Sequence, residues 1–541
     1  MGEGEQRSGA SMGDCLGRPG TRLDIAALLL IGALLVAPCV MRLGFYSDDW
    51  DIILTLSRSE FGEPFRYFAA RPMQALYAAL TYAALGAHPL GHHLALAALL
   101  ILSFPLLYLL MLRLGADRRQ AFAAAALFAV LPQLSTIRVW IAAAAVPLSM
   151  VFALLSIHCQ LTFARSRAVG SAALALLFAV LSIAAYETFA PLIFAFALWL
   201  AWSRPDHRSW KAVALVLGVL ALAILLKLAI TDRAGAVADI GRYLKGLQQL
   251  FRTDYDWRVD GGLNIKAALD VHFVQTLAGW VKAASALLSG ELAALPLLAV
   301  LGPSALALWR LHASDAPSTG MAPGRLFLVG LAAFVLGHAA FLIVPSIIFS
   351  PTGLANRALV PAAMGVALIS TAAFSWLGGR IYPFAVAALV LLGAARTAQI
   401  TEYWAEAPAR QHRILAAART DLRSVPEGST VVLDGVCPYV GPAPVFETWW
   451  DVGPSLTLAL GRTVRGDIVT DRMTVTSSGL VTAIYREPTV HRFGARLFFY
   501  DPRVPMLVQV RDEATAREYF RLRAGTAPRC PQSFVGHGVL I

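Results

Sequence analysis

The chain has 541 residues, of which 57% are hydrophobic and only 15% are charged. So much apolar surface excludes a soluble globule and predicts a polytopic membrane protein. The net charge of +11 does not indicate nucleic-acid binding, because the sequence has no basic patch interleaved with aromatic residues. We therefore expect the lipid bilayer to be a partner and nucleic acid not to be one.

Apolar runs that approach the length of a membrane crossing recur over residues 1–398. A crossing needs about 20 apolar residues, or about 17 at the shortest. We count about eleven such runs, two of them short. They are Leu23–Met41 and residues 93–112, 120–133, 141–163, 169–185, 189–203, 211–230, 292–309, 325–345, 357–376 and 381–398. The expected fold is therefore mostly α, a polytopic membrane helical bundle of about eleven transmembrane helices.

Arginines gather in alternate short loops between these runs, as at Arg113, Arg118 and Arg119. Cytoplasmic loops carry such an excess of basic residues. The pattern predicts a cytoplasmic N-terminus and places the opposite loops, and everything after residue 398, outside. High Ala and Arg with few Lys is typical of a GC-rich bacterial genome, so we expect the bacterial inner membrane.

After residue 398 the hydropathy changes character. A polar helix is expected first, and then strand-like runs and a final helix. These segments are Thr401–Leu422, Thr430–Leu433, Arg496–Tyr500, Met506–Val510 and Asp512–Arg523. We expect residues 1–398 to form a transmembrane domain and residues 399–541 to form an extracytoplasmic (periplasmic) α/β domain of about 140 residues.

Cysteine usage agrees with this topology. Cys15, Cys39 and Cys159 lie in or near the membrane or its inner face, where no disulfide is expected. Cys437 and Cys530 are the two cysteines of the outward C-terminal region. We predict that they pair in an oxidising compartment.

The first outward loop, residues 42–92, opens with the acids Asp48, Asp49 and Asp51. Carboxylates beside hydrocarbon are costly and are usually kept for a function. The alternative is that they only cap a helix at the water boundary. Two stretches, Trp50–Ser57 and Phe65–Tyr82, have near-helical spacing of apolar residues and predict helices along the membrane surface. Such helices would hold the acidic pair in place.

Later outward turns carry other candidates. Glu187, after Tyr186, lies at an outer tip, where it is equally an exposed tip residue or a second acid facing the aspartates. Arg357, after Asn356, enters a late helix, as an interface anchor or as a guanidinium that grips phosphate.

Two further outward segments have structural interpretations. Arg138 and Trp140 are typical of interface anchors. The stretch Ile265–Leu288 is amphipathic, and we interpret it as a surface helix that gates a lateral opening.

The sequence has no Walker loop, dinucleotide fingerprint, HExxH or paired CxxC. A carboxylate can instead take a proton from an attacking hydroxyl while a nearby Arg balances a phosphate leaving group. This combination suits the transfer of a sugar from a polyprenyl-phosphate carrier, which needs no nucleotide site.

The chain resembles the integral-membrane glycosyltransferases of the GT-C superfamily in four features. They are the acidic pair after the first helix, about eleven crossings, Tyr186-Glu187 at an outer tip and Asn356-Arg357 entering a late helix. Its trailing α/β region is also similar to members of that group. The resemblance covers the whole chain in architecture, through short motifs. It implies inverting transfer of a sugar from a polyprenyl-phosphate-linked donor to an extracytoplasmic glycan, lipid or protein.

The resemblance also implies roles for single residues. The catalytic base falls on Asp48 or Asp49, and we favour Asp48, with Asp49 positioning the acceptor or a neighbouring group. The basic residues near the donor phosphate fall on Arg357 and, less surely, Arg71.

Glu187, Tyr186 and Asn356 are the remaining candidates for substrate contact or for a second acid. Some relatives hold a divalent metal with a first-loop acid and an Asp-x-Asp motif in a later loop. In this chain the match is the single Glu187, so a divalent metal is doubtful and we assign no metal ligands or cofactors.

Two other functions stay open. A lipid or sugar transporter or flippase would bind near the bilayer midplane on broken helices, whereas these acids cluster at the outer edge. The main exception is His338, roughly mid-helix, and such a histidine is more often a satisfied core residue. A non-catalytic envelope-assembly protein would bind through its C-terminal domain and use the acids only to solvate loop ends.

Overall fold

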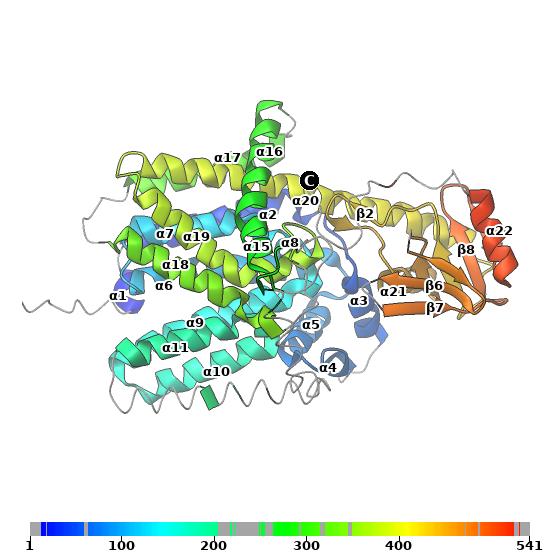
Figure 1. The fold of residues 1–541 in the computed structure, drawn as a ribbon, viewed down its shortest axis with the longest axis horizontal. Coiled ribbons are helices and arrows are strands. Elements are labelled where there is room, and N and C mark those ends of the chain that lie inside the picture. Colours follow the sequence, from blue (N-terminus) through cyan, green and yellow to red (C-terminus); the bar gives the residue numbers. More distant parts are fainter. Residues whose placement is uncertain are drawn as a thin grey trace, which may run out of the picture.

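The computed structural model has a helical bundle and a smaller α/β part (Figure 1). Helix α20 (Tyr382–Asp421) belongs to both, since it runs from the bundle into the α/β part. The described residues are 12–17, 19–58, 63–203, 217, 218, 221, 225, 248, 250–254, 263–290, 294–313, 320–343, 349–470, 472–484, 487–523 and 530.

The bundle consists of long apolar helices. Besides α20 they are α2 (Pro19–Val40), α6 (Pro89–Arg113), α7 (Arg118–Val130), α9 (Ala145–Ser166), α10 (Val169–Ala185), α11 (Ala190–Ser203), α17 (Ala294–Ala313), α18 (Pro323–Ala339) and α19 (Val360–Ser375). Within the described ranges, six helices are long and apolar enough to cross a membrane, and a bent pair makes up to seven. The chain is therefore a multi-pass membrane protein.

The expected count of about eleven crossings is not confirmed. Three of the apolar helices, α10, α11 and Leu297–Ala313 of α17, are shorter than a full crossing. The run expected at 211–230 falls almost entirely outside the described residues.

The loop at residues 42–92, which we expect to face outward, is helical as predicted. It forms α3 (Asp48–Arg58), α4 (Glu63–Tyr67) and α5 (Pro72–Leu85), which lie at the end of the bundle nearest the α/β part (Figure 1). The three aspartates occupy the first turn of α3, where the positive end of the helix dipole favours carboxylates.

Short helical turns connect the longer elements. They are α1 (Met12–Gly17), η1 (Pro132–Leu134), α8 (Ser135–Val139), η2 (Ile141–Ala144), η3 (Glu187–Phe189), η5 (Ala340–Ile343) and η6 (Leu354–Leu359). The amphipathic stretch is α15 (Ile265–Leu269), a π-helical turn η4 (Asp270–Val274) and α16 (Gln275–Leu288). Its helical character is confirmed, and its role as a gate stays a prediction.

The interpretation of Arg138 and Trp140 as interface anchors is wrong, because both lie buried inside the protein. Helices α7 and η1–α8 meet at a bend of 56°. Arg138, 1% exposed, donates to the carbonyl of Ala129 (2.7 Å) and to Oγ1 of Thr397 (3.2 Å). A cation beside the last carbonyls of a helix satisfies acceptors that have no intrahelical partner. Arg138 therefore holds the bend in α7–α8 and ties it to α20.

A buried polar cluster joins four helices at the opposite end of the bundle from α3. Asp24 of α2 is 1% exposed and forms ion pairs with Arg118 of α7 (2.8 Å) and Arg310 of α17 (2.7 Å). The hydroxyl of Tyr108 in α6 donates to the same carboxylate (2.7 Å). Buried charges need such pairing, so this cluster fixes how α2, α7 and α17 pack.

The α/β part contains a mixed sheet in the order β4-β1-β8-β9. Strand β1 runs parallel to β4 and β8, and β9 is antiparallel to β8. After α20, the elements of the α/β part are β1 (Thr430–Leu433), β2 (Tyr439–Val440), β3 (Ala443–Pro444), α21 (Trp449–Leu460), β4 (Arg465–Ile468), β5 (Thr474–Thr476), β6 (Gly479–Ile484), β7 (Glu487–His491), β8 (Leu497–Asp501), β9 (Met506–Gln509) and α22 (Glu513–Arg523).

The strands expected at 430–433, 496–500 and 506–510 and the final helix are confirmed as β1, β8, β9 and α22. The membrane run expected at 381–398 and the polar helix expected at 401–422 form the single helix α20. The division into domains at residue 398 stays a prediction, because α20 crosses that point without a break.

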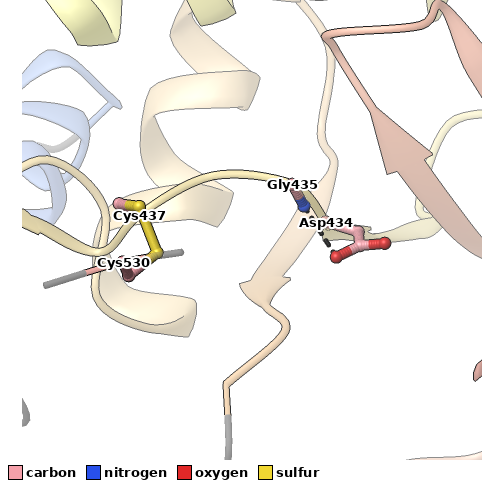
Figure 2. Close-up of a disulfide and its surroundings, with 4 residues drawn as sticks. All are labelled: Asp434, Gly435, Cys437 and Cys530. Carbon is pink, nitrogen blue, oxygen red and sulfur yellow. Dashed lines mark hydrogen bonds between the residues drawn. A yellow bond between two sulfur atoms is a disulfide. The ribbon is translucent and has the colours of Figure 1, made fainter. Parts of the chain in front are cut away.

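Cys437 and Cys530 form a disulfide with a Cα–Cα distance of 5.4 Å (Figure 2). The predicted pairing is therefore confirmed. Cys437 follows β1 in the loop that begins at Asp434 and Gly435 (Figure 2). The bond links this loop to a residue 93 positions later in the chain.

Candidate active site

The segment before α3 is held in place by hydrogen bonds from three other elements. The Tyr46 hydroxyl donates to the carbonyl of Trp404 in α20. Nε2 of His93 donates to the carbonyl of Gly44 (2.8 Å), and Nε1 of Trp140 donates to the carbonyl of Tyr46 (3.1 Å). These contacts fix the direction in which α3 begins, and with it the position of the acidic pair.

Asp49 is 1% exposed, and both of its carboxylate oxygens are engaged by the backbone. Oδ2 accepts from the N–H of Tyr46 (3.0 Å) and Oδ1 accepts from the N–H of Ala142 (2.7 Å). Burial raises the pKa of Asp49 well above its usual value, and these N–H groups partly oppose the shift. Asp49 therefore ties α3 to the turn after Trp140.

Asp48 is half-buried and lies in the electrostatic field of two arginines. Burial raises the pKa of its carboxyl group, and the positive charges of Arg357 and, more weakly, Arg71 oppose that shift. The neighbouring Asp51 raises the pKa further, and the Ser47 hydroxyl, which donates to Oδ1 (3.4 Å), lowers it. The charges of Arg357 in η6 and of Arg71 just before α5 thus act on Asp48 at the start of α3.

Each of the two arginines lies over an aromatic ring. Cζ of Arg71 is 4.4 Å from the centre of the Tyr186 ring, and Cζ of Arg357 is 4.8 Å from the Trp140 ring. Arg357 also donates to the carbonyl of Leu354 (3.0 Å). A guanidinium stacked on a ring is held by cation–π attraction and still has N–H groups at its edge for an anion.

The other predicted residues have different positions. Tyr186 is buried beneath Arg71 and supports it. Glu187 is half-buried at the start of η3, and its role as a second acid stays a prediction. Asn356 is buried; its Nδ2 donates to the carbonyl of Pro351 (2.9 Å) and its Oδ1 accepts from Ser135 (3.3 Å). Through these hydrogen bonds Asn356 stabilises the turn that carries Arg357.

The doubt about a divalent metal stays a prediction. Among the residues that the structure describes, no three His, Cys, Asp or Glu side chains are grouped closely enough to hold an ion. Asp49 has its oxygens on backbone N–H groups, and Arg357 and Arg71 place positive charge beside Asp48. We derive no step that uses a metal.

Two contacts of the acidic loop were not anticipated from the sequence. The Tyr67 hydroxyl of α4 donates to Asp51 (2.8 Å). Nε1 of Trp450, in α21 of the α/β part, donates to the Ser47 hydroxyl (3.2 Å). Ser47 has a positive φ of 47°, a strained conformation for a residue with a side chain. The paired tryptophans at 449 and 450 are the one sequence signal that could have indicated this contact.

Comparisons with known proteins find similarity only among solved structures, since no family model and no curated protein match the chain. ArnT from Cupriavidus metallidurans, bound to undecaprenyl phosphate, is 13% identical over 82% of this chain and 85% of its own, with a TM-score of 0.35. The archaeal oligosaccharyltransferase AglB from Archaeoglobus fulgidus, in complex with an inhibitory peptide and a dolichol-phosphate, is 13% identical over 82% of this chain and 64% of its own, with a TM-score of 0.38.

The arabinofuranosyltransferase AftD from Mycobacteria is 17% identical over 87% of this chain and 34% of its own length, with a TM-score of 0.40. The chain thus spans less than two thirds of AglB and about a third of AftD. All three TM-scores are below 0.5, so the similarity is too low to assign a fold or an activity.

Proposed function

We propose that the chain is a membrane glycosyltransferase of the GT-C type. It transfers a sugar from a polyprenyl-phosphate-linked donor to an extracytoplasmic acceptor, with inversion at the anomeric carbon and Asp48 as the general base. The observation that carries this proposal is the position of the Asp48 carboxylate within the fields of Arg357 and Arg71 at one end of a membrane bundle.

In the proposed step the acceptor hydroxyl oxygen attacks the anomeric carbon of the donor sugar. The bond from that carbon to the phosphate oxygen breaks, and its electron pair leaves with the phosphate. The hydroxyl proton passes to Asp48. A carboxylate whose pKa is raised by burial is a stronger base than a free aspartate, and the positive charges of the neighbouring arginines favour its ionised form.

Arg357 and Arg71 are the proposed phosphate ligands. Negative charge grows on the phosphate as the bond breaks, and fixed cations at that point stabilise the transition state more than the ground state. Stacking on Trp140 and Tyr186 fixes the orientation of both guanidinium groups before the donor binds, which lowers the entropy lost on binding.

The difference between the two adjacent acids supports the proposal of inversion. A retaining reaction through a covalent intermediate needs a second carboxylate as nucleophile. Asp49 is unsuited to that role, because both of its oxygens accept backbone hydrogen bonds. A single displacement with Asp48 as base is the step that this geometry supports.

The test is Asp48→Asn in the purified full chain, assayed for transfer of labelled sugar from a polyprenyl-phosphate donor. Loss of a general base should lower kcat on the order of 10²-fold or more and leave donor binding unchanged. Glu63→Gln is the matched control, since Glu63 lies in the same loop and pairs only with exposed Arg66 among the described residues. Transfer at the parent rate by folded Asp48→Asn would refute the proposal.

The phosphate ligands have a separate test. Arg357→Ala should weaken donor binding on the order of tenfold, because it removes a charge-assisted contact. Unchanged donor affinity would return Arg357 to the role of an interface anchor.

A further inference from the structure

A second candidate site lies in the α/β part, at the carboxyl ends of β1 and β8. These strands are parallel neighbours, and the chain passes from β1 to β4 on one side while β8 lies on the other. Open α/β sheets bind ligands in the crevice at such a point, where the connections diverge to opposite sides. The topology therefore predicts a ligand site between the loops that begin at Asp434 and Pro502.

A cavity of about 360 Å³ lies at these carboxyl ends of the strands. The volume is within the usual range for a small-molecule site. The cavity is lined by Arg410, Arg413 and Ile414 of α20, by Gly435, Val436 and Cys437 after β1, by Val445, and by Pro502 and Arg503 after β8. All of these residues are described, and none of them carries a carboxylate, so the lining is positively charged.

The three arginines are held to different degrees. Arg503 forms an ion pair with Asp501 (2.8 Å), the buried last residue of β8. Arg410 pairs with Glu406 one turn earlier in α20 (2.6 Å). Arg413 is exposed and has no ion-pair partner in the described part of the chain. The cavity thus combines two oriented guanidinium groups with one that is available to a ligand.

Gly435 is required for this arrangement. Its φ is +72°, which favours glycine. A Cβ at this position would overlap the guanidinium group of Arg503. The N–H of Gly435 is turned to Asp434 (2.6 Å; Figure 2), and two residues later the Cys437–Cys530 disulfide anchors the loop. The backbone is therefore shaped to admit Arg503 to the cavity.

We infer that this cavity is a binding site for a phosphate monoester. Guanidinium forks match the oxygens of phosphate. Arg413 supplies a positive charge that no carboxylate balances in the described part of the chain, and Arg410 and Arg503, whose charges are shared with Glu406 and Asp501, add oriented N–H donors for a group that carries about −1.5 to −2 charge at neutral pH. The phosphate belongs either to a soluble ester or to the head group of a lipid. The site is separate from Asp48 and does not depend on the proposed transfer reaction.

The test uses the full chain in phosphatidylcholine nanodiscs, titrated with glycerol 3-phosphate and followed by calorimetry. The parent should show saturable binding. The double variant Arg410→Ala/Arg413→Ala should bind at least about tenfold more weakly, because two charge-assisted contacts are lost. Arg511→Ala is the matched control. Because β9 is antiparallel to β8, Arg511 follows β9 at the end of the sheet opposite the cavity, and this variant should bind like the parent.

A second arm separates the two sources of the phosphate. Nanodiscs with phosphatidic acid should suppress the titration if a lipid head group is the ligand, and should leave it unchanged if the ligand is soluble. Equal binding by the parent and the double variant, or no saturable binding by the parent, would overturn the inference. The assay requires no transfer activity, so its failure is distinct from a failure of the proposed function.

Discussion

The indole N–H of Trp450 donates a hydrogen bond to the hydroxyl oxygen of Ser47 (3.2 Å). The same hydroxyl donates to Oδ1 of Asp48 (3.4 Å). A helix of the α/β part thus reaches, through one serine, the residue that we propose as the base. The bond from Trp450 occupies the Ser47 oxygen as an acceptor, which leaves its hydrogen free to point to Asp48.

Trp450→Phe tests this relay. The change keeps a ring and removes the donor, so Ser47 can rotate away from Asp48. We expect kcat to fall about fivefold, as for the loss of a hydrogen bond of about 1 kcal/mol. We also expect the acidic limb of the pH profile to move upward, because the Ser47 hydroxyl lowers the pKa of Asp48. Trp376→Phe, an exposed tryptophan of the bundle, is the control. If kcat falls but the acidic limb of the pH profile does not move, the role of Trp450 is packing and the relay is contradicted.

The pH dependence of transfer should follow the charges around Asp48. The base must be ionised, so activity is lost as the pH falls through its pKa, and burial sets that pKa above the usual 3.8. Arg357→Gln removes a charge that lowers the pKa and should move the acidic limb to higher pH. Asp51→Asn removes a charge that raises it and should move the limb to lower pH. Profiles of kcat against pH for the parent and both variants would check these signs. Shifts in the same direction would contradict Asp48 as the titrating group.

The buried polar cluster should be important for stability. Asp24→Asn would leave Arg310, which is 4% exposed, without its counter-charge. Removal of one partner from a buried pair costs about 3–5 kcal/mol, whereas Glu63→Gln breaks an exposed pair that should contribute about 0–1 kcal/mol. Denaturant unfolding in detergent would compare the two variants. Equal losses would show that the cluster does not stabilise the packing of α2 and α17.

The disulfide should stabilise the α/β part. Cys437→Ser opens a link between residues 93 apart and should lower the free energy of unfolding by about 2–4 kcal/mol. Cys159→Ser, at a free thiol in α9, is the control and should have little effect. Thiol labelling of unreduced protein checks the bond directly, and two reactive thiols at Cys437 and Cys530 would disprove it.

Local patterns in the sequence were sufficient for most of the helices and for three of the strands. Apolar runs, the near-helical spacing in residues 50–57 and 65–82, and the β-branched run at Thr430–Leu433 are properties of neighbouring residues, and they predicted α3, α5 and β1. The disulfide was predictable because topology left only Cys437 and Cys530 in the outward region. Strand β4 and helix α21 were not predicted, and α20 was divided in two, because a change from apolar to polar composition does not interrupt a helix.

The sequence by itself thus determined that this is a multi-pass membrane protein with an acidic loop after its first helix. The family resemblance favoured Asp48 over Asp49 as the base, but the two residues are adjacent and chemically identical, and only the tertiary structure supplied a physical reason to separate them. Asp49 meets the N–H of Ala142, 93 residues away, whereas Asp48 meets the charges of Arg71 and Arg357. Such contacts join segments that are distant in the chain, and hydrophobic periodicity carries information only about neighbours. For the same reason Arg138 and Trp140, which the sequence placed at the membrane surface, lie inside the protein.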